Sequence, residues 1–372
     1  MTTAKEKLDQ KFMHLALIEA QKGEYQTWPN PWVGAVLVKN GKVVGRGWHR
    51  GAGLPHAEAE ALREAGKKAK GATAYVTLEP CNHYGRTPPC AAALVEAGVK
   101  RVVAAVPDDH PKAQGGMKYL KAHGVQIGPY VLRAEAEALN RYFFFSVKQG
   151  RPWFTLKAAA SLDGRTATSK GESQWITSAE ARADSRLLRA QCDAILVGAG
   201  TVTKDQPSLM PRLHDRNGFV PWRLVLDPRG QLKGDESVFR DGDASRTIWF
   251  AGAGSFQNAV ESARQGGHAQ VQSLHAGGLS GAVLSALEWM RSHDLRRVMV
   301  EGGAATLGAF LKLGLADELV LYLAPRLEGS GKGLPIFQST DEKKLKDWPG
   351  LHLRDIKIVG GDIRIHGYFN KD

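Results

Sequence analysis

His56-Ala57-Glu58, followed by Pro80-Cys81 and then by Cys90, is the part of the 372-residue sequence that says most about its fold and chemistry. One imidazole and two thiolates suit zinc, and three protein ligands leave a fourth tetrahedral position open for water. Zinc lowers the pKa of such a water to about 7, which supplies hydroxide at neutral pH. We therefore expect a catalytic zinc site and predict His56, Cys81 and Cys90 as its ligands.

Glu58 is predicted as the catalytic residue beside this metal rather than as a fourth ligand. A His-x-Glu motif with a downstream Pro-Cys and a second Cys is typical of zinc deaminases, in which the glutamate relays protons. A lone histidine, or two cysteines nine positions apart, would more often be structural, so the joint pattern carries the argument. The spacing differs from the common Cys-x-x-Cys, because eight residues separate Cys81 from Cys90.

Composition limits the class of protein. The net charge of +12 comes from scattered residues, 50 Lys and Arg against 38 Asp and Glu, and fits an anionic metabolite as well as a nucleic acid. No apolar run approaches the roughly 20 residues that span a bilayer, and the N-terminus has no apolar signal core. Three cysteines are too few for a disulfide framework. We expect a cytoplasmic protein that binds neither membrane nor nucleic acid.

The length favours two domains, and the pattern of strands and helices predicts an α/β fold in each. We place a deaminase domain at 1–150 and a second domain at 151–372, joined by a linker within 140–152. Asp9 is expected to cap the first helix, and Asn40-Gly41 to form a hairpin turn. The elements expected in the first half are helices at 9–22, 57–65 and 90–97 and strands at 33–39, 42–48, 74–78 and 101–106.

The second half restarts with a strand at 153–159 and a helix at 178–190, for which Thr177 and Glu180 have the spacing of a capping box. A closing hairpin is expected around Gly360-Gly361. Gly198-Ala199-Gly200 follows an apolar strand and suits either a dinucleotide fingerprint without its third glycine or a plain turn. The remaining expected elements are strands at 194–197, 223–226, 247–250, 297–300 and 318–323 and a helix at 304–313.

A family resemblance covers the chain from about residue 10 to the C-terminus. Thr77-Leu-Glu-Pro-Cys-Asn-His-Tyr-Gly-Arg-Thr-Pro-Pro-Cys90 resembles the deaminase domain of the bifunctional riboflavin-biosynthesis deaminase–reductases, which share this long loop between the cysteines. Pro29-Asn30-Pro31-Trp32-Val33-Gly34 resembles the family's substrate motif, so Asn30 is expected to bind the pyrimidine. The second half matches in the segments Lys157-Ala-Ala-Ala-Ser161-Leu-Asp163-Gly-Arg165, Gly171-Glu-Ser173-Gln-Trp175-Ile-Thr177 and Glu301-Gly302-Gly303.

The resemblance implies a cytidine-deaminase-like three-layer domain followed by a dihydrofolate-reductase-like domain that uses NADPH. It also implies cofactor contacts at Ala159, Trp175, Thr201, Asp205 and Gly303. The substrate would be held by Ser173, Arg189, Leu209, Arg212 and Glu301. Arginines suit a ribose 5-phosphate because the guanidinium forms bidentate, charge-assisted hydrogen bonds.

Three positions depart from the family pattern. Asp205-Gln206-Pro207-Ser208-Leu209-Met210 stands where Asp-Asp-Pro-x-Leu-Thr is common, Ala35 replaces a frequent cysteine, and the segment at Gly115-Gly116 is one residue short of Gly-x-Gly. Asp163 is expected to cap a turn rather than to catalyse, while Asp205 is a candidate proton donor.

The resemblance implies that the substrate is 2,5-diamino-6-(5-phosphoribosylamino)pyrimidin-4-one, deaminated first and then reduced at C1′ of its ribosyl group. We expect a homo-oligomer, with a dimer favoured. One alternative is a tRNA-editing type of zinc deaminase with an accessory domain, which would leave the second half unexplained. Another is a non-catalytic zinc protein, against which Glu58 argues.

Overall fold

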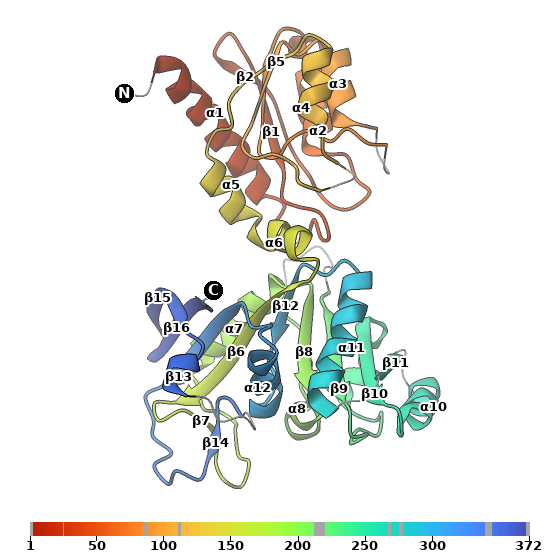
Figure 1. Cartoon of the computed structure of the whole chain (residues 1–372), viewed down its shortest axis with the longest axis vertical. Coiled ribbons are helices and arrows are strands. Elements are labelled where there is room, and N and C mark those ends of the chain that lie inside the picture. The colour runs from red at the N-terminus through yellow and green to blue at the C-terminus, as the bar shows by residue number, and fades with distance from the viewer. Residues whose placement is uncertain are drawn as a thin grey trace. The chain divides into compact units, whose positions relative to one another are not determined.

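The computed structural model describes residues 3–24, 26–84, 88–110, 113–211, 220–266, 269–274, 278–338 and 344–369 (Figure 1). The chain divides into two compact units, Met1–Gly150 and Arg151–Asp372. In the described part, no helix is both long enough and apolar enough to cross a membrane.

The first unit has one sheet, with strand order β2-β1-β3-β4-β5. β1 runs antiparallel to β2 and β3, whereas β3, β4 and β5 are parallel. Its elements are α1 (Ala4–Gln21), β1 (Gly34–Lys39), β2 (Lys42–Trp48), α2 (Ala57–Ala65), a 3₁₀ turn (Gly66–Ala69), β3 (Thr73–Val76), α3 (Cys90–Glu96), β4 (Arg101–Ala104), α4 (Gly116–Ala122), β5 (Gln126–Ile127), α5 (Arg133–Leu139) and α6 (Arg141–Gln149).

Helices cover both faces of this sheet and give the expected three layers. Two glycines allow the close packing. A Cβ on Gly34 would lie 2.1 Å from the carbonyl oxygen of Ala16 in α1, and a Cβ on Gly47 would lie 2.1 Å from that of Ala57 in α2. α1 and α5 pack on one face, while α2, α3 and α4 pack on the other.

Two local predictions for this unit were wrong. α1 begins earlier than expected, and Thr3 caps it in a capping box with Glu6. Asp9 is instead buried in the helix, where it accepts hydrogen bonds from Tyr75 and Arg101 at 2.7–2.8 Å. The stretch expected as a linker contains α6, which ends at Gly150 in the left-handed conformation.

The second unit has a mixed sheet of order β11-β10-β9-β8-β12-β6-β13-β16-β15. The strands from β11 to β13 are parallel, and the β15–β16 hairpin adds the expected antiparallel edge. Its elements are β6 (Trp153–Ser161), β7 (Arg165–Ala167), α7 (Ala179–Ala190), β8 (Ala194–Gly198), α8 (Ala199–Asp205), β9 (Trp222–Asp227), α9 (Ser237–Arg240), a 3₁₀ turn (Ala244–Arg246), β10 (Thr247–Gly252), α10 (Phe256–Gly266), β11 (Gln270–Leu274), α11 (Gly278–Ser292), β12 (Arg297–Val300), α12 (Ala304–Lys312), β13 (Glu318–Ala324), β14 (Leu334–Pro335), a 3₁₀ turn (Leu345–Asp347), β15 (Leu351–Val359) and β16 (Asp362–Phe369).

Helices also cover both faces of this sheet. α7, α8, α9 and α10 share one core cluster with the sheet. On the opposite face, α12 packs Phe310 against Phe154 of β6, and α11 packs Trp289 against Phe250 of β10, with ring centroids 4.9 and 6.0 Å apart. The predicted capping box at α7 was wrong, since Ser178 is the cap and accepts from the backbone N–H of Ala181 at 3.1 Å.

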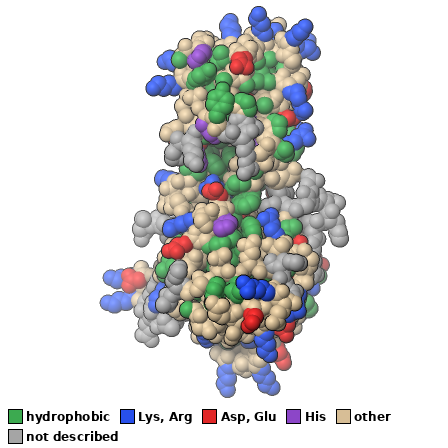
Figure 2. Space-filling view, turned by 90° about the vertical axis from the view of Figure 1, so that its right-hand side faces the viewer, with side chains coloured by type: hydrophobic (Ala, Val, Ile, Leu, Met, Phe, Trp, Pro, Cys, Tyr) green, Lys and Arg blue, Asp and Glu red, His purple; other side chains and the backbone are tan. Residues whose placement is uncertain are grey.

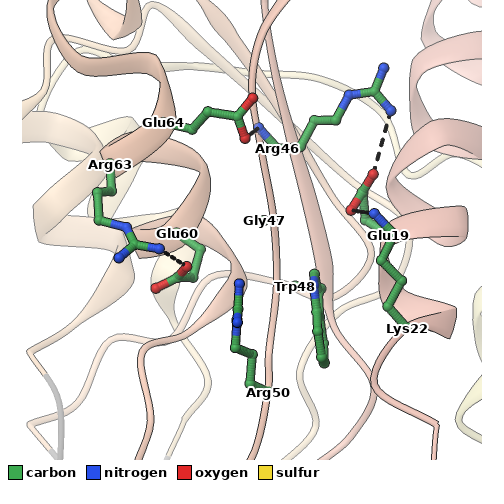
Figure 3. Close-up of a pocket in the computed structure, with 9 residues that line it drawn as sticks. All are labelled: Glu19, Lys22, Arg46, Gly47, Trp48, Arg50, Glu60, Arg63 and Glu64. Atoms are coloured by element: carbon green, nitrogen blue, oxygen red, sulfur yellow. Dashed lines mark hydrogen bonds and ion pairs between the residues drawn. The ribbon is translucent and has the colours of Figure 1, made fainter.

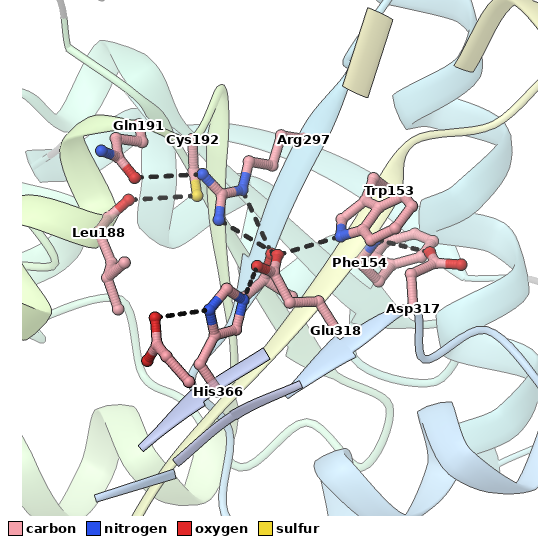
Figure 4. A network of polar contacts seen from close by, with 11 residues as sticks. Trp153, Phe154, Leu188, Gln191, Cys192, Arg297, Asp317, Glu318 and His366 are labelled. Atoms are coloured by element: carbon pink, nitrogen blue, oxygen red, sulfur yellow. Dashed lines mark hydrogen bonds and ion pairs between the residues drawn. The ribbon is translucent and has the colours of Figure 1, made fainter. Parts of the chain in front are cut away.

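A buried polar network joins the central strands (Figure 4). Glu318 of β13 accepts hydrogen bonds from Thr155 at 2.5 Å and Arg297 at 3.2 Å, and lies 2.7 Å from Nε2 of His366. Burial opposes ionisation of Glu318, yet Arg297, His366 and Thr155 together lower its pKa to about 2. The network joins β6, β12, β13 and β16, and the cavity described below is lined by residues 157–159 of β6 and by the segment that follows β12.

Candidate functional site

The three predicted metal ligands converge in the first unit. His56 precedes α2, Cys81 follows β3, and Cys90 is the first residue of α3. Their ligand atoms all lie within 4.8 Å of one another. His56 Nδ1 lies 3.2 Å from Cys90 Sγ and 3.6 Å from Cys81 Sγ. A tetrahedral zinc with Zn–N of about 2.0 Å and Zn–S of about 2.3 Å separates its ligand atoms by similar amounts, so the set fits zinc.

The backbone around Cys81 is tightly constrained. Cys81 Sγ accepts from the backbone N–H of Cys90 at 3.4 Å, and its carbonyl accepts from Ala91 at 3.2 Å. A hydrogen bond from the Cys90 side chain, with help from His56, lowers the pKa of Cys81 well below that of an ordinary thiol. Gly116 at the start of α4 lies against this segment, because a Cβ there would be 1.7 Å from the carbonyl oxygen of Pro80.

Glu58 lies in the first turn of α2 and is buried beside these ligands, with 4% of its surface exposed. Burial and then the neighbouring Cys81 raise its pKa to about 7. A carboxyl group that titrates near neutral pH can both accept and return a proton, as a proton relay requires.

Asn30 is connected to the metal-ligand cluster by His49, a residue to which the sequence assigned no role. Asn30 Nδ2 lies 2.9 Å from His49 Nε2, and the His49 ring packs edge-on against His56 with centroids 5.3 Å apart. Burial lowers the pKa of His49, which favours the neutral ring that can accept from the amide. His49 directly follows β2. The Asn40-Gly41 hairpin signal predicts where that strand lies, so it could have indicated the position of His49.

A cavity of about 400 Å³ in the second unit gathers the predicted reductase residues. Arg212 lies outside the described residues. All the other predicted substrate and cofactor residues of this unit line the cavity, namely Ala159, Ser173, Trp175, Arg189, Thr201, Asp205, Leu209, Glu301 and Gly303. The Leu209 side chain belongs to the core, with 1% exposed, and its backbone is left-handed at φ 58°, which is unusual for leucine.

A second cavity of about 590 Å³ shares part of this lining and continues past the ends of β8 and β9. The shared residues include Ser173, Thr201, Asp205 and 301–304. Gly198 and Gly302 both lie against Thr306, because a Cβ added at either position would be 2.7 or 2.4 Å from the Thr306 side chain. Residues 302–306, at the N-terminus of α12, line this cavity, and backbone N–H groups at a helix N-terminus suit a dinucleotide pyrophosphate.

Lys157 is a further cavity residue that the sequence analysis left without a role. It belongs to β6, and burial lowers its pKa although Glu301 is nearby. Glu301 in turn accepts from Arg189 Nε at 2.6 Å and Nη2 at 2.8 Å. Lys157, Glu301 and Arg189 thus place two cations around one carboxylate at the floor of the cavity.

Two aspartates of the second unit differ in their surroundings. Asp163 accepts from the backbone N–H groups of Gly329 at 2.9 Å and Glu328 at 3.0 Å, and these bonds lower its pKa. These bonds give Asp163 a structural role, but they hold the loop at 328–329 rather than cap the turn after β6 as expected. Asp205 accepts from Ser173 Oγ at 3.3 Å and lines both cavities, which leaves it available to a ligand.

Among the described residues, a further cavity of the first unit is separate from the predicted site residues. A cavity of about 430 Å³ lies between α1, β2 and α2 in the first unit, and none of the predicted site residues lines it (Figure 3). Lys22 and Arg46 both pair with Glu19 there, and Arg63 pairs with Glu60. Lys and Arg side chains are dispersed over both units on the face drawn in Figure 2 rather than gathered into one band.

Comparisons with known proteins agree with both sites. Residues 6–106 match the cytidine and deoxycytidylate deaminase zinc-binding region, and residues 152–365 match the RibD C-terminal domain. The riboflavin biosynthesis protein RibD of Escherichia coli strain K12 is 42% identical over 375 residues, covering 96% of this chain and 98% of that protein.

Solved structures give the same result. The Acinetobacter baumannii RibD structure (form 2) has a TM-score of 0.88 at 36% identity and covers 99% of this chain and 100% of that one. A Thermotoga maritima structure, titled a diaminohydroxyphosphoribosylaminopyrimidine deaminase/5-amino-6-(5-phosphoribosylamino)uracil reductase, has a TM-score of 0.84 at 32% identity and covers 98% and 100%.

The fold and sites therefore define a bifunctional enzyme, a zinc deaminase joined to an NADPH-using reductase. The chain belongs to the RibD family of riboflavin biosynthesis. The predicted family, fold class and pair of activities are confirmed, and the match of the second unit removes the reason for considering a tRNA-editing deaminase.

Proposed function

We propose that Met1–Gly150 deaminates 2,5-diamino-6-(5-phosphoribosylamino)pyrimidin-4-one and that Arg151–Asp372 reduces the resulting ribosylaminouracil to its ribityl form. The observation that carries the first assignment is the His56, Cys81 and Cys90 cluster with Glu58 buried beside it. The two overlapping cavities support the second, because they can hold a substrate and a dinucleotide in contact.

In the deaminase unit, His56, Cys81 and Cys90 would hold zinc, which when bound activates water for attack on the ring carbon that carries the 2-amino group. Glu58 takes one proton from the water and gives it to the ring nitrogen, and it then takes the remaining hydroxyl proton of the adduct and gives it to the departing amine, which leaves as ammonia. Its pKa of about 7 suits both directions of transfer. Asn30 would hydrogen-bond the pyrimidine, and its contact with His49 supports this role because it orients the amide.

In the reductase unit, bound NADPH would be the source of the hydride for C1′ of the opened ribosyl group. Ala159, Trp175, Thr201, Asp205 and Gly303 would contact it, while Ser173, Arg189, the backbone at Leu209, and Glu301 would hold the substrate, together with Arg212. Lys157 lies at the floor of the substrate end beside Glu301 and can donate a hydrogen bond to the ribosyl chain.

The test is one reaction in which ammonia release and NADPH oxidation are followed together with the diaminopyrimidine substrate. Ammonia followed by an equal amount of NADP⁺ supports both assignments. Ammonia without NADPH oxidation contradicts the reductase assignment, and oxidation without ammonia contradicts the order of the two steps. The same reaction started from the uracil intermediate isolates the second unit.

We also propose a cytoplasmic homodimer. The three cysteines of the sequence are free, which suits a reducing compartment. β15 ends the sheet, and a register shift between Leu353 and Asp355 aligns Leu353 with Ile356 and Ile358 on one face, where they are 52%, 59% and 70% exposed. A second copy would cover these side chains. Sedimentation velocity should show a dimer for wild type and a monomer for Ile358→Asp. If the variant is still a dimer, β15 is not the dimer interface.

A further inference from the structure

α7 carries three arginines on one face. Arg182, Arg186 and Arg189 are spaced four and three residues apart, so they lie above one another along the helix. All three line the 400 Å³ cavity of the second unit. Of these three arginines, only Arg189 has a role implied by the family resemblance.

Most of the hydrogen-bonding capacity of Arg189 is used within the protein. Its Nε and Nη2 donate to the two carboxylate oxygens of Glu301 at 2.6 and 2.8 Å, and its Nη1 lies 3.5 Å from the carbonyl oxygen of Met210. A guanidinium has five N–H donors in a fixed plane, and its charge here is balanced by a buried carboxylate. Arg189 therefore has little left with which to bind a dianion alone.

Arg182 is also held in place. Its Nη1 donates to the carbonyl oxygen of Thr177 at 2.6 Å, and its guanidinium lies 4.4 Å from the ring centroid of Trp175. These contacts leave it cationic without a carboxylate. Because Trp175 is one of the predicted cofactor contacts, Arg182 lies on the cofactor side of the cavity lining.

Arg186 lies between these two arginines and is half-buried. Among the described residues it has no hydrogen-bond or ion-pair partner, although its neighbours on the same face are both engaged. A half-buried arginine that faces a cavity without a partner is suited to a ligand anion, because a guanidinium binds phosphate through parallel N–H donors.

The charge of the cavity lining favours the same kind of ligand. In the described lining, four cations (Lys157, Arg182, Arg186 and Arg189) face two carboxylates, Asp205 and Glu301. A phosphate monoester carries close to two negative charges at neutral pH, so it would balance the excess. A neutral sugar or ring would leave that excess uncompensated.

We infer that Arg186 is a phosphate-binding residue of the reductase, and that it makes this site select 5-phosphorylated over dephosphorylated substrate. The inference rests on the proposed function of the second unit. In this arrangement Arg189 and Glu301 position each other, and Arg186 provides the cation that the substrate neutralises.

The test compares Arg186→Ala with wild type on the phosphorylated uracil substrate and on its dephosphorylated form. Losing a charged hydrogen bond raises KM for the phosphorylated substrate about tenfold to hundredfold, and leaves KM for the dephosphorylated form unchanged. Arg186→Lys should recover part of the loss. Arg291→Ala, an exposed arginine of α11 outside the cavities, is the matched control.

Direct binding gives a readout besides turnover. Calorimetry with ribose 5-phosphate should show weaker binding to Arg186→Ala than to wild type, whereas NADPH affinity, measured by fluorescence, should be unchanged. Equal losses for both substrate forms, or no loss, would overturn the inference. If wild type oxidises no NADPH with either substrate, the proposed function fails instead, and ribose 5-phosphate binding still decides the role of Arg186. Should Arg186→Ala lose NADPH binding through misfolding, Arg186→Lys and Arg186→Gln provide the comparison.

Discussion

Arg189 of α7 and Glu301, on the segment after β12, form a bidentate ion pair with N–O distances of 2.6 and 2.8 Å. The pair connects a helix to the end of a central strand, and Lys157 adds a second cation beside the same carboxylate. The same ion pair therefore holds α7 against the segment after β12 and forms part of the cavity lining.

Glu301→Gln should therefore impair both stability and reduction. The variant keeps the side-chain shape but leaves two partly buried cations, Lys157 and Arg189, without their carboxylate, which costs at most the roughly 3–5 kcal/mol of a fully buried pair. Chemical denaturation should show this loss, and NADPH oxidation should fall while ammonia release persists. Wild-type stability in the variant would show that the pair is not what holds α7 to β12.

Glu58→Gln separates zinc binding from proton transfer. The amide cannot relay protons, so ammonia release should fall about 10²–10⁴-fold, while zinc per chain and NADPH oxidation from the uracil intermediate stay unchanged. Glu96→Gln, an exposed glutamate of α3, is the control. Retained deamination would contradict the assignment of Glu58 as the catalytic residue.

Gly116→Ala tests whether α4 supports the metal ligands. The added Cβ would sit 1.7 Å from the carbonyl oxygen of Pro80, next to Cys81. Overpacking of this kind costs about 1–3 kcal/mol, and the segment must move to relieve it. Metal analysis should find less zinc bound, with reduction intact. Gly242→Ala, where a Cβ meets nothing within 4 Å, should leave zinc content unchanged.

Glu318→Gln tests the buried network of the second unit. At neutral pH the variant should lose about 3–5 kcal/mol, because Arg297 remains buried without its partner. The folded-state pKa of Glu318, about 2, lies below the ordinary value of 4.5, so its contribution is complete above pH 4.5 and is lost as the pH falls towards 2. The stability difference should narrow over that range. Glu261→Gln, on the exposed face of α10, should show no difference at any pH.

Elements with strong local signals were predicted closely. The strand expected at 42–48 and the helix expected at 57–65 match β2 and α2 residue for residue, because alternation, the Asn-Gly turn and helical spacing are local properties. The cap of α1 and the helix α6 were missed. Asp9 is recruited by Tyr75 and Arg101 from distant strands, and such tertiary partners override a local capping preference.

The candidate sites divide in the same way. The metal cluster could be predicted because the residue types are rare and their order is distinctive. Lys157 could not, since a lysine at the start of an alanine run resembles a surface position until β12 and β13 pack on either side of its strand. His49 could not be predicted either, because its contact with Asn30 forms only in the folded protein. The same holds for Arg186, because only the fold shows that it faces the cavity.

The zinc ligands come from three separate segments, one before α2, one after β3 and one at the start of α3. A metal that ties them together contributes its binding free energy to folding as well as to chemistry. Zinc supply would then set how much of this protein survives in a cell. Under zinc starvation the deaminase unit would unfold more readily and become more susceptible to proteolysis, while the reductase unit holds none of these three ligands.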